Sequence, residues 1–448
     1  MRAPPLFRFR TAALLLTVVG TLHGLLYVPL VSSNVTADSA TYIAAGRALD
    51  HGAYTTPLRA GLHYTPHGPV DSTALALPRR TWTVPEKQAF RPPGYPLLLA
   101  LVGGGRAGAS RLAALALNAA VFGVGAFLLA LTVRRWWGAG IALAAEALYV
   151  VDPYSKHDVA LVLSEPLAAA LVLAAVYAFT RAWDERSLGW WGAAALFAAA
   201  LTLTRVVFVI VLLLLAIAAL LRAAAARRWL ASTLVVCACG AALIGPWLAW
   251  TDHVVAKPVL ATYGEGFNLD LAAHGEGLGK TESDVAAEPA FRRDLAASHR
   301  SAPSLPTLLH DPFAHPRYVE RADSVLRARA RSLYEHRLRH EPAQVAWEVL
   351  YRAYFLWQAH EDWYQPEGLA LLPLRIVDWL LTALALLGAL FAVRRGGAAR
   401  AVVVLVGLYT LAIAVHHVEA RFAMPFRGIE LALVALASAK LVRRLAWR

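Results

Sequence analysis

One carboxylate stands out by its position in the chain. Asp38 lies in a polar stretch, residues 34–42, which follows directly after an apolar run that ends near Val31. A carboxylate held at a membrane surface can accept the proton of an attacking hydroxyl group, which is the task of a general base. It can equally cap the N-terminus of a helix over residues 39–49, an ordinary use of aspartate. The residues alone leave both interpretations open.

Basic side chains near the ends of apolar runs are a second group that could do chemistry. Cations stabilise the negative charge that develops on a departing anionic group. Arg91, Lys156, Arg205 and Arg421 are placed for this task, with Lys156 inside a compact polar loop over residues 152–158. Arg205 stands between two apolar runs, where a charge is costly unless it has a partner or faces a polar cavity. Its side chain can also reach the membrane interface without any function.

Other polar and aromatic residues accompany these cations. Glu165 begins an apolar run, which indicates either a functional acid in the membrane or a first-turn residue favoured by the helix dipole. Glu419 can pair with the nearby arginine at position 421. Tyr42 and Tyr95 can stack on a ring of a ligand, although interfacial tyrosines commonly serve only as anchors. His416 is a candidate for binding at the same end of the membrane; we assign no metal ligands and leave a divalent metal ion open as a cofactor.

The composition indicates a polytopic membrane protein. Of the 448 residues, 58% are hydrophobic, against about 45–50% in ordinary soluble domains. Apolar runs of ~20 residues recur along the chain and are long enough to cross a hydrocarbon core of about 30 Å. We therefore expect an all-α polytopic membrane protein.

The net charge of +13 reports membrane topology. The arginines cluster between apolar runs, as in short cytoplasmic loops. The clusters are Arg2, Arg8 and Arg10; Arg134 and Arg135; Arg181 and Arg186; Arg222, Arg227 and Arg228; Arg394, Arg395 and Arg400; and Arg443, Arg444 and Arg448. A nucleic-acid-binding protein would instead gather its charge on one face or along one helix, so we expect no nucleic-acid partner.

The apolar runs predict about ten membrane spans. They lie near residues 11–31, 110–133, 138–151, 160–180, 188–203, 206–222, 230–250, 369–393, 400–416 and 427–442. With the N-terminus inside, an even number of spans returns the C-terminus to the cytoplasm, and every arginine cluster then falls on that side, with both long loops outside. The segment 94–102 is too short to span and is expected to lie along the interface or dip into the protein.

The second long loop is expected to form a domain of its own outside the membrane. Residues 319–339 and 345–357 carry apolar positions at intervals of three and four, which predicts two helices, whereas 291–316 is predicted to be irregular. The chain then divides into an N-terminal transmembrane module (1–250) with a first outer loop (33–109), an extracytoplasmic loop domain (251–368) and a C-terminal transmembrane module (369–448).

Seven short motifs occur along the predicted outer side. They are Asp38 with Tyr42, Ala45, Leu49, Gly52 and Tyr54; residues 91–98; residues 163–167; residues 203–205; residues 245–247 with Asn268; the two helices around residues 340–342 with Trp357; and residues 419–422 with Pro425. In this order they resemble the bacterial branch of the GT-C glycosyltransferases, which includes aminoarabinose transferases and is related to the protein O-mannosyltransferases. The fifth motif commonly ends in Arg-Asn, whereas Thr251-Asp252 stands here, so no role passes to Asp252.

The resemblance implies a GT-C-like bundle of about ten transmembrane helices, with interfacial outer-loop helices and a mostly helical outer loop domain. It implies an inverting transfer of a hexosyl or pentosyl group from a polyprenyl-phosphate donor to a cell-envelope acceptor, which is a lipid, a glycan or a protein. The reaction would take place on the extracytoplasmic face of a bacterial cell membrane, among membrane lipids. Asp38 would be the general base. The donor phosphate would be bound by Arg91, Lys156, Arg205 and Arg421, and the substrate by Tyr42, Tyr95, Glu165, His416 and Glu419.

Other functions stay open at this point. A ligase or polymerase that moves a larger glycan from a polyprenyl-diphosphate carrier would share a related fold, and would rely more on basic residues than on a first-loop acid. A lipid transporter or flippase would carry internal repeats and helices broken at mid-membrane; the sequence shows neither. A member of the family without catalytic activity would serve as a scaffold.

Overall fold

The computed structural model shows an almost entirely helical protein. The described residues are 5–28, 39, 42–43, 45–46, 49, 55–56, 86–87, 91–103, 111–223, 229–261, 264–275, 285, 288–300, 316–358 and 372–446. Within these ranges the β structure consists of two antiparallel two-residue strands, β1 (Thr55–Thr56) and β2 (Glu86–Lys87). Asp38 lies outside the described residues.

A helix occupies each of the ten predicted spans. They are α1 (Pro5–Tyr27), α4 (Arg111–Trp137), α5 (Ala139–Val151), α7 (Glu165–Glu185), α8 (Leu188–Thr204), η3 with α9 (Val206–Phe208 and Val209–Ala223), α10 (Trp229–Val255), α17 (Leu372–Arg395), α18 (Gly397–Ile413) and α19 (Arg427–Leu445). Five of these, α1, α4, α7, α10 and α17, are long and apolar enough to cross a membrane. The protein is therefore an all-helical polytopic membrane protein, and the number of ten crossings stays a prediction.

The surface of this bundle is that of a protein in lipid. Large apolar side chains lie exposed on its outer helices, such as Leu15 of α1, Leu221 of α9 and Leu386 of α17. Exposed apolar patches of this extent are rare on soluble monomers. Inside the bundle, α7 packs against α4, α8 and α18, and α19 packs against α5 and α17. A Cβ atom on Gly388 would lie 2.1 Å from the carbonyl oxygen of Leu433, so α17 and α19 meet through a glycine, as small residues commonly permit in membranes.

The short apolar segment after residue 93 is a helix, α3 (Gly94–Gly103), as its length predicted. It packs against α4 and α8. A Cβ atom on Gly94 would lie 2.6 Å from the carbonyl oxygen of Leu203. The start of α3 therefore lies directly against the end of α8, and brings the first outer loop to that end of the bundle.

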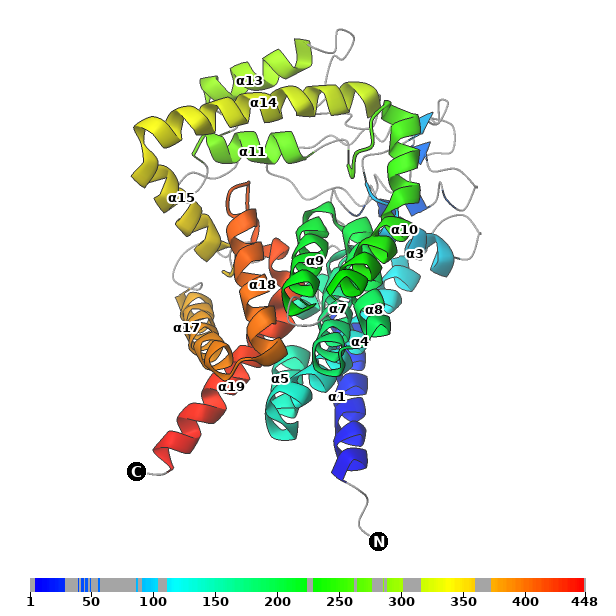
Figure 1. The fold of residues 1–448 in the computed structure, drawn as a ribbon, viewed down its shortest axis with the longest axis vertical. Helices are drawn as coiled ribbons and strands as arrows, with labels where there is room; N and C mark the ends of the chain where they lie inside the picture. Colours follow the sequence, from blue (N-terminus) through cyan, green and yellow to red (C-terminus); the bar gives the residue numbers. More distant parts are fainter. Residues whose placement is uncertain are drawn as a thin grey trace.

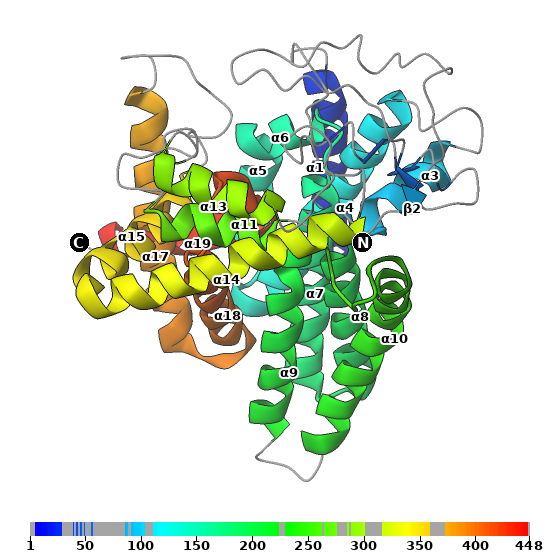
Figure 2. The same ribbon diagram turned by 90° about the horizontal axis from the view of Figure 1, so that it is seen from above.

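Four helices outside the bundle form a cap, here called the outer domain: α11 (Glu265–Ala273), α13 (Pro289–Arg300), α14 (Pro316–His340) and α15 (Pro342–Phe355). The long α14 lies across the bundle with α11 beneath it and α13 above it, and both chain termini lie at the opposite end of the molecule (Figure 1). Figure 2 shows α14 running over the bundle from α15 towards α10, against which it packs.

The two helices predicted for this domain are confirmed by α14 and α15. Pro342 lies in the first turn of α15, where the backbone N–H that proline lacks would have no hydrogen-bond partner inside the helix. The prediction of irregular structure from residue 291 onward is wrong for 291–300, which belong to α13. Pro289 starts this helix, and the buried ring of Phe291 packs edge-on against Phe267 at 5.8 Å between centroids. Tertiary packing thus overrides the polar composition.

Polar contacts fix α11 to α14. The buried carboxylate of Asp323 on α14 accepts the backbone N–H groups of Gly264, Gly266 and Phe267 at 2.9–3.3 Å. These are the N–H groups at the start of α11, which have no partner inside the helix. A Cβ atom on Gly266 would lie 2.0 Å from the carbonyl oxygen of Asp323, so only glycine permits this approach.

The outer domain rests on the turn that follows α18. The Tyr334 hydroxyl donates to the carbonyl of Val415 at 2.7 Å, and the Arg352 guanidinium donates to the carbonyl of Ala414 at 2.7 Å. The backbone N–H of His417 donates to the carbonyl of Asn268 in α11 at 2.9 Å. The domain is thereby attached to residues 414–417, a few residues before Arg421.

Candidate active site

An ion pair at the domain-facing end of the bundle forms the centre of the candidate site. Glu165 is the first residue of α7, and Arg205 lies in extended conformation at the break between α8 and η3. Their side chains form an ion pair, and both are largely buried. Because a buried charge needs a partner, this pair explains how an arginine is tolerated between two apolar helices.

Tyr42 of the first outer loop lies against the same end of α7. Its hydroxyl is 3.0 Å from the Ser164 hydroxyl, which in turn donates to Glu165 at 3.4 Å. The Arg91 guanidinium carbon lies 4.9 Å from the centroid of the Tyr42 ring, within range of a cation–π contact. The loop residues Tyr42 and Arg91 are therefore connected to the Glu165–Arg205 pair.

Tyr95 packs against Tyr42 and connects it to α4. Its ring packs edge-on against Tyr42, with 5.2 Å between centroids, and it is fully buried. Its hydroxyl donates to the Asn118 side chain at 3.2 Å, and the Asn118 amide donates to the carbonyl of Leu161 at 2.6 Å. Tyr95 thus positions Tyr42 and does not itself line a surface.

Two guanidinium groups lie close to a single aromatic ring next to this ion pair. The guanidinium carbons of Arg205 and Arg421 lie 5.4 and 6.0 Å from the centroid of Phe422. Arg421 forms an ion pair with Glu419, whose other carboxylate oxygen is 3.3 Å from His417 Nε2. Two guanidinium groups at one ring, each fixed by a carboxylate, are placed to contact one anion together.

Asp158 is an acid of this cluster that sequence reasoning missed. It is buried in α6 (Pro153–Val159), which Asp152 caps by accepting the Ser155 backbone N–H at 2.9 Å. Burial raises the pKa of Asp158 well above its ordinary value, and Glu165 raises this pKa further, against the opposing effect of Arg205 and Arg421. The polar loop at 152–158 was the only signal in the sequence that could have identified it.

Two predicted residues lie apart from this cluster. The Lys156 amino group lies 2.5 Å from Nδ1 of His23 on α1, so it faces the N-terminal helix. His416 follows α18 and lies near Glu265 and Arg352, under the outer domain. The structure therefore brings together Tyr42, Arg91, Tyr95, Glu165, Arg205, Glu419 and Arg421.

The ionisation of Glu419 yields a prediction about the dependence of turnover on pH. Burial opposes the charge of Glu419, but Arg421 and His417 outweigh burial and lower the pKa of Glu419 from 4.5 to about 2. A lowered pKa contributes stability that is present above pH 4.5 and lost as the pH falls towards 2. Glu419 therefore stays ionised at every ordinary assay pH. We expect Glu419→Gln to leave the midpoint of the acidic limb of the rate–pH profile unchanged; disappearance of that limb in the variant would show that Glu419 is the titrating group.

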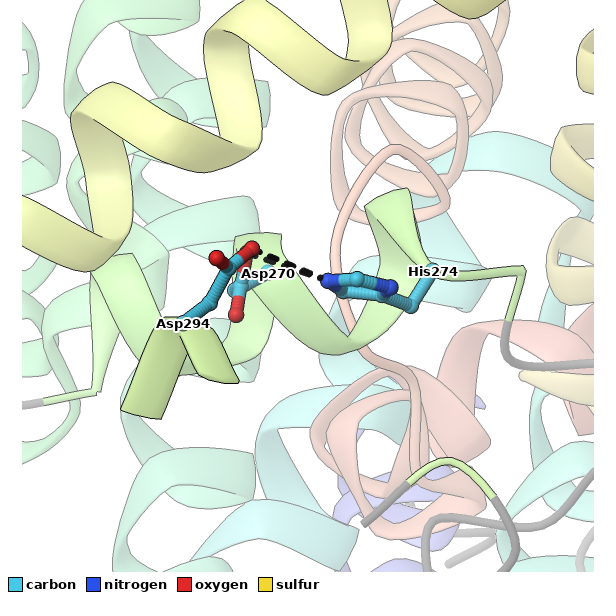
Figure 3. A group of neighbouring side chains, drawn as sticks. All are labelled: Asp270, His274 and Asp294. Atoms are coloured by element: carbon cyan, nitrogen blue, oxygen red, sulfur yellow. Dashed lines mark hydrogen bonds and ion pairs between the residues drawn. The ribbon is translucent and has the colours of Figure 1, made fainter. Parts of the chain in front are cut away.

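Outside this cluster, one group of described side chains has the spacing of metal ligands. Asp270, His274 and Asp294 belong to the outer domain, and their potential ligand atoms lie within 4.8 Å of one another (Figure 3).

The comparison with known proteins agrees with this architecture. Residues 91–250 match the model of the dolichyl-phosphate-mannose-protein mannosyltransferase family. That stretch contains Arg91, Asp158, Glu165 and Arg205 but covers less than half of the chain. None of the curated proteins matches the chain in sequence.

Solved structures show a similarity of fold. The apo oligosaccharyltransferase of Archaeoglobus fulgidus aligns with a TM-score of 0.55 at 14% identity, over 98% of this chain and 51% of that one. The oligosaccharyltransferase AglB of the same organism, in complex with an inhibitory peptide and a dolichol-phosphate, aligns with a TM-score of 0.53 at 15% identity, over 97% and 50%. The chain thus spans about half the length of these enzymes.

ArnT of Cupriavidus metallidurans, bound to undecaprenyl phosphate, is 15% identical over 97% of this chain and 77% of its own. Its TM-score of 0.39 is too low to support an assignment of the fold. The oligosaccharyltransferases, the family match and the helix arrangement point the same way. The chain has the GT-C fold of membrane glycosyltransferases, as its ordered motifs predicted.

Proposed function

We propose that the protein is an integral membrane glycosyltransferase that takes a sugar from a polyprenyl-phosphate donor and passes it to a cell-envelope acceptor. The observation that carries this proposal is the placement of Arg205 and Arg421 beside one ring, at the end of the bundle that the outer domain covers. A lipid phosphate lies at the membrane interface, where these cations are expected. The reaction is assigned to the extracytoplasmic face of a bacterial cell membrane, the side that the charge distribution predicts for this end.

The cations would act on the leaving group. When the bond between the anomeric carbon and the phosphate oxygen breaks, negative charge grows on the phosphate, and guanidinium groups fixed in place stabilise it. Arg205 is held by Glu165 and Arg421 by Glu419, so neither has to be reoriented during the reaction. Arg91, beside Tyr42, is a third cation close to the same end of α7.

Asp38 is assigned as the general base. The acceptor hydroxyl attacks the anomeric carbon from the side opposite the phosphate, and its proton passes to the carboxylate as the new bond forms. Attack from that side inverts the configuration at the anomeric carbon. Ser39, the next residue in the chain, and Tyr42 are both buried, and Tyr42 is bonded to Ser164 at the start of α7. These contacts support a first outer loop held against the Glu165–Arg205 pair.

A second candidate is the transfer of a larger glycan from a polyprenyl-diphosphate carrier, which the fold similarity to oligosaccharyltransferases favours. A diphosphate carries more negative charge than a monophosphate, and a site with several guanidinium groups suits it as well. The two candidates differ in the donor that they require.

A panel of radiolabelled donors decides between them. Purified protein in lipid is given polyprenyl-phosphate monosaccharides and polyprenyl-diphosphate glycans, and label transfer to envelope extracts is measured. We expect transfer from a monophosphate donor, and we expect Arg421→Gln to lower kcat/KM about 10²-fold, the usual cost of removing one charge-stabilising group. Arg339→Gln, which changes an exposed arginine of α14, is the matched control and should retain full activity.

Transfer only from diphosphate-linked glycans would establish the second candidate. No transfer from any donor, in protein that melts cooperatively, would contradict both candidates and favour a scaffold or a lipid transporter. Equal activity of the parent and Arg421→Gln would show that Arg421 does not contribute to the donor site.

A further inference from the structure

Three potential metal ligands converge in the outer domain, away from the proposed donor site. Asp270 lies on α11, and His274, four residues later, caps the C-terminus of that helix with its backbone N–H bonded to the Asp270 carbonyl at 3.0 Å, so both residues lie on the same side of the helix. Asp294 reaches them from α13 (Figure 3). His274 Nε2 lies 3.3 Å from Asp294 Oδ2 and 3.8 Å from Asp270 Oδ1. The three groups therefore surround a single point between the two helices.

The buried carboxylate of Asp270 lacks the interactions that would compensate for its burial. Its side chain is fully buried, and neither of its oxygens accepts a hydrogen bond from any part of the chain that the structure describes. A buried carboxylate without hydrogen bonds is strongly unfavourable. Burial and the neighbouring Asp294 raise its pKa to about 7, against the opposing effect of Arg329. An ion bound by both carboxylates would remove this cost.

The surroundings resemble the second layer of a metal site. The other oxygen of Asp294, Oδ1, forms an ion pair with Arg329 of α14, which leaves Oδ2 directed at His274. The His274 ring packs edge-on against Phe291, with 5.7 Å between centroids. Groups that hold the ligands in place in this manner are a regular feature of metal sites.

From these observations we propose that Asp270, His274 and Asp294 bind a divalent transition-metal ion, with Zn²⁺ as the best-fitting ion. One imidazole nitrogen and two carboxylate oxygens are a familiar ligand set for Zn²⁺, whereas Mg²⁺ and Ca²⁺ prefer oxygen ligands alone. The site joins α13 to α11. Because α11 carries Asn268, whose carbonyl accepts the N–H of His417, the ion also steadies one of the three helices through which the outer domain contacts the turn after α18.

Zinc binding by the full-length protein tests this site. The protein is purified in detergent, stripped with EDTA, desalted and titrated with ZnSO₄ against a chromophoric chelator. We expect one tightly bound Zn²⁺ per chain. Asp270→Asn and His274→Gln should each weaken binding by about 100-fold or more, and Arg329→Gln, which loosens a ligand, by about 10–100-fold.

Another histidine pair provides the matched control. His336 and His340, also four residues apart, stack at 4.2 Å on α14 and offer an alternative surface site. The double variant His336→Gln/His340→Gln should bind Zn²⁺ as the parent does. Loss of binding in this variant alone, or equal binding by the parent, Asp270→Asn and His274→Gln, would overturn the proposal, as would a parent that binds no Zn²⁺.

Thermal unfolding separates lost binding from lost folding. In EDTA, Asp270→Asn should melt no lower than the parent, because the substitution removes a buried charge that lacks a hydrogen bond. Added ZnSO₄ should raise the Tm of the parent, since an ion that binds only the folded state stabilises it, and should leave the Tm of both Asp270→Asn and His274→Gln unchanged. An equal Zn²⁺-induced rise in all three proteins would contradict the assigned ligands.

Discussion

Asp38→Asn is expected to lower the kcat of sugar transfer by about 10²–10⁴-fold, the contribution usual for a general base. Asparagine keeps the size of the side chain but cannot accept the proton of the acceptor hydroxyl group. The donor should still bind, because the cations assigned to its phosphate are unchanged. Turnover of the radiolabelled donor and equilibrium binding of the polyprenyl phosphate, measured in the same lipid, check both parts.

Asp252→Asn is the matched control, because Asp252 is an exposed aspartate on the α10 end that faces the outer domain. It should keep parental turnover. If Asp38→Asn turned over as fast as the parent, the base would have to be another acid. Asp158 would then be the first candidate, because its buried carboxyl interacts with Glu165, Arg205 and Arg421, and burial raises its pKa above the ordinary value, which makes it a stronger base. Glu419, with a pKa of about 2, is too weak a base for that task.

Arg427→Gln is expected to destabilise the protein by about 3–5 kcal/mol, the cost of leaving a buried ion pair without one partner. The Arg427 guanidinium lies 3.1 Å from Asp152, 2.8 Å from Glu430 and 3.9 Å from Asp378. It therefore holds the cap of α6, the start of α19 and the first turns of α17 together. Without it the buried acids Asp152, Asp378 and Glu430 lose the cation that they share. The Tm in detergent, followed by loss of helical signal or by dye binding, measures the effect.

Arg339→Gln, which changes an exposed arginine, should leave the Tm unchanged. The double variant Arg427→Met/Asp152→Asn should recover part of the loss, because it removes a positive and a negative charge together. A Tm of Arg427→Gln equal to that of the parent would show that these acids are neutral in the folded protein and that the pairing contributes nothing.

The helices of the bundle were predictable because their signal is local. A run of about twenty apolar residues identifies a membrane helix whatever its neighbours are. The span predicted from residue 160 starts later, at Glu165, because residues 160–164 form a turn and bend after α6. The span predicted from residue 11 starts earlier, at Pro5. In the outer domain, α13 was missed because it is polar along most of its length and depends on contacts with α11 and α14.

The candidate site was predictable only in part, since its contacts join distant parts of the chain. The motifs identified Glu165 and Arg205 separately, and the structure shows that they pair. Arg427 and Asp152 are 275 residues apart, so no spacing rule connects them. Asp158 and the Asp270–His274–Asp294 group were likewise missed, because burial and the meeting of helices give them their character.

At the turn after α18, the side chains that attach the outer domain to the bundle come from the outer domain. The donors are the side chains of Tyr334 and Arg352. Their acceptors, Val415 and Ala414 respectively, take part only through their backbone carbonyl oxygens. A third contact at this turn, from His417 to Asn268, is made by two backbones. On α17 the bundle does supply a side chain, since the Trp379 indole donates to the Tyr354 hydroxyl of α15 at 2.6 Å. The two side-chain hydrogen bonds at the turn after α18 therefore depend on Tyr334 and Arg352, and not on the side chains of Ala414 and Val415. The sequence of this turn can thus drift over evolution, while Tyr334 and Arg352 have to be retained for the outer domain to keep its place on it.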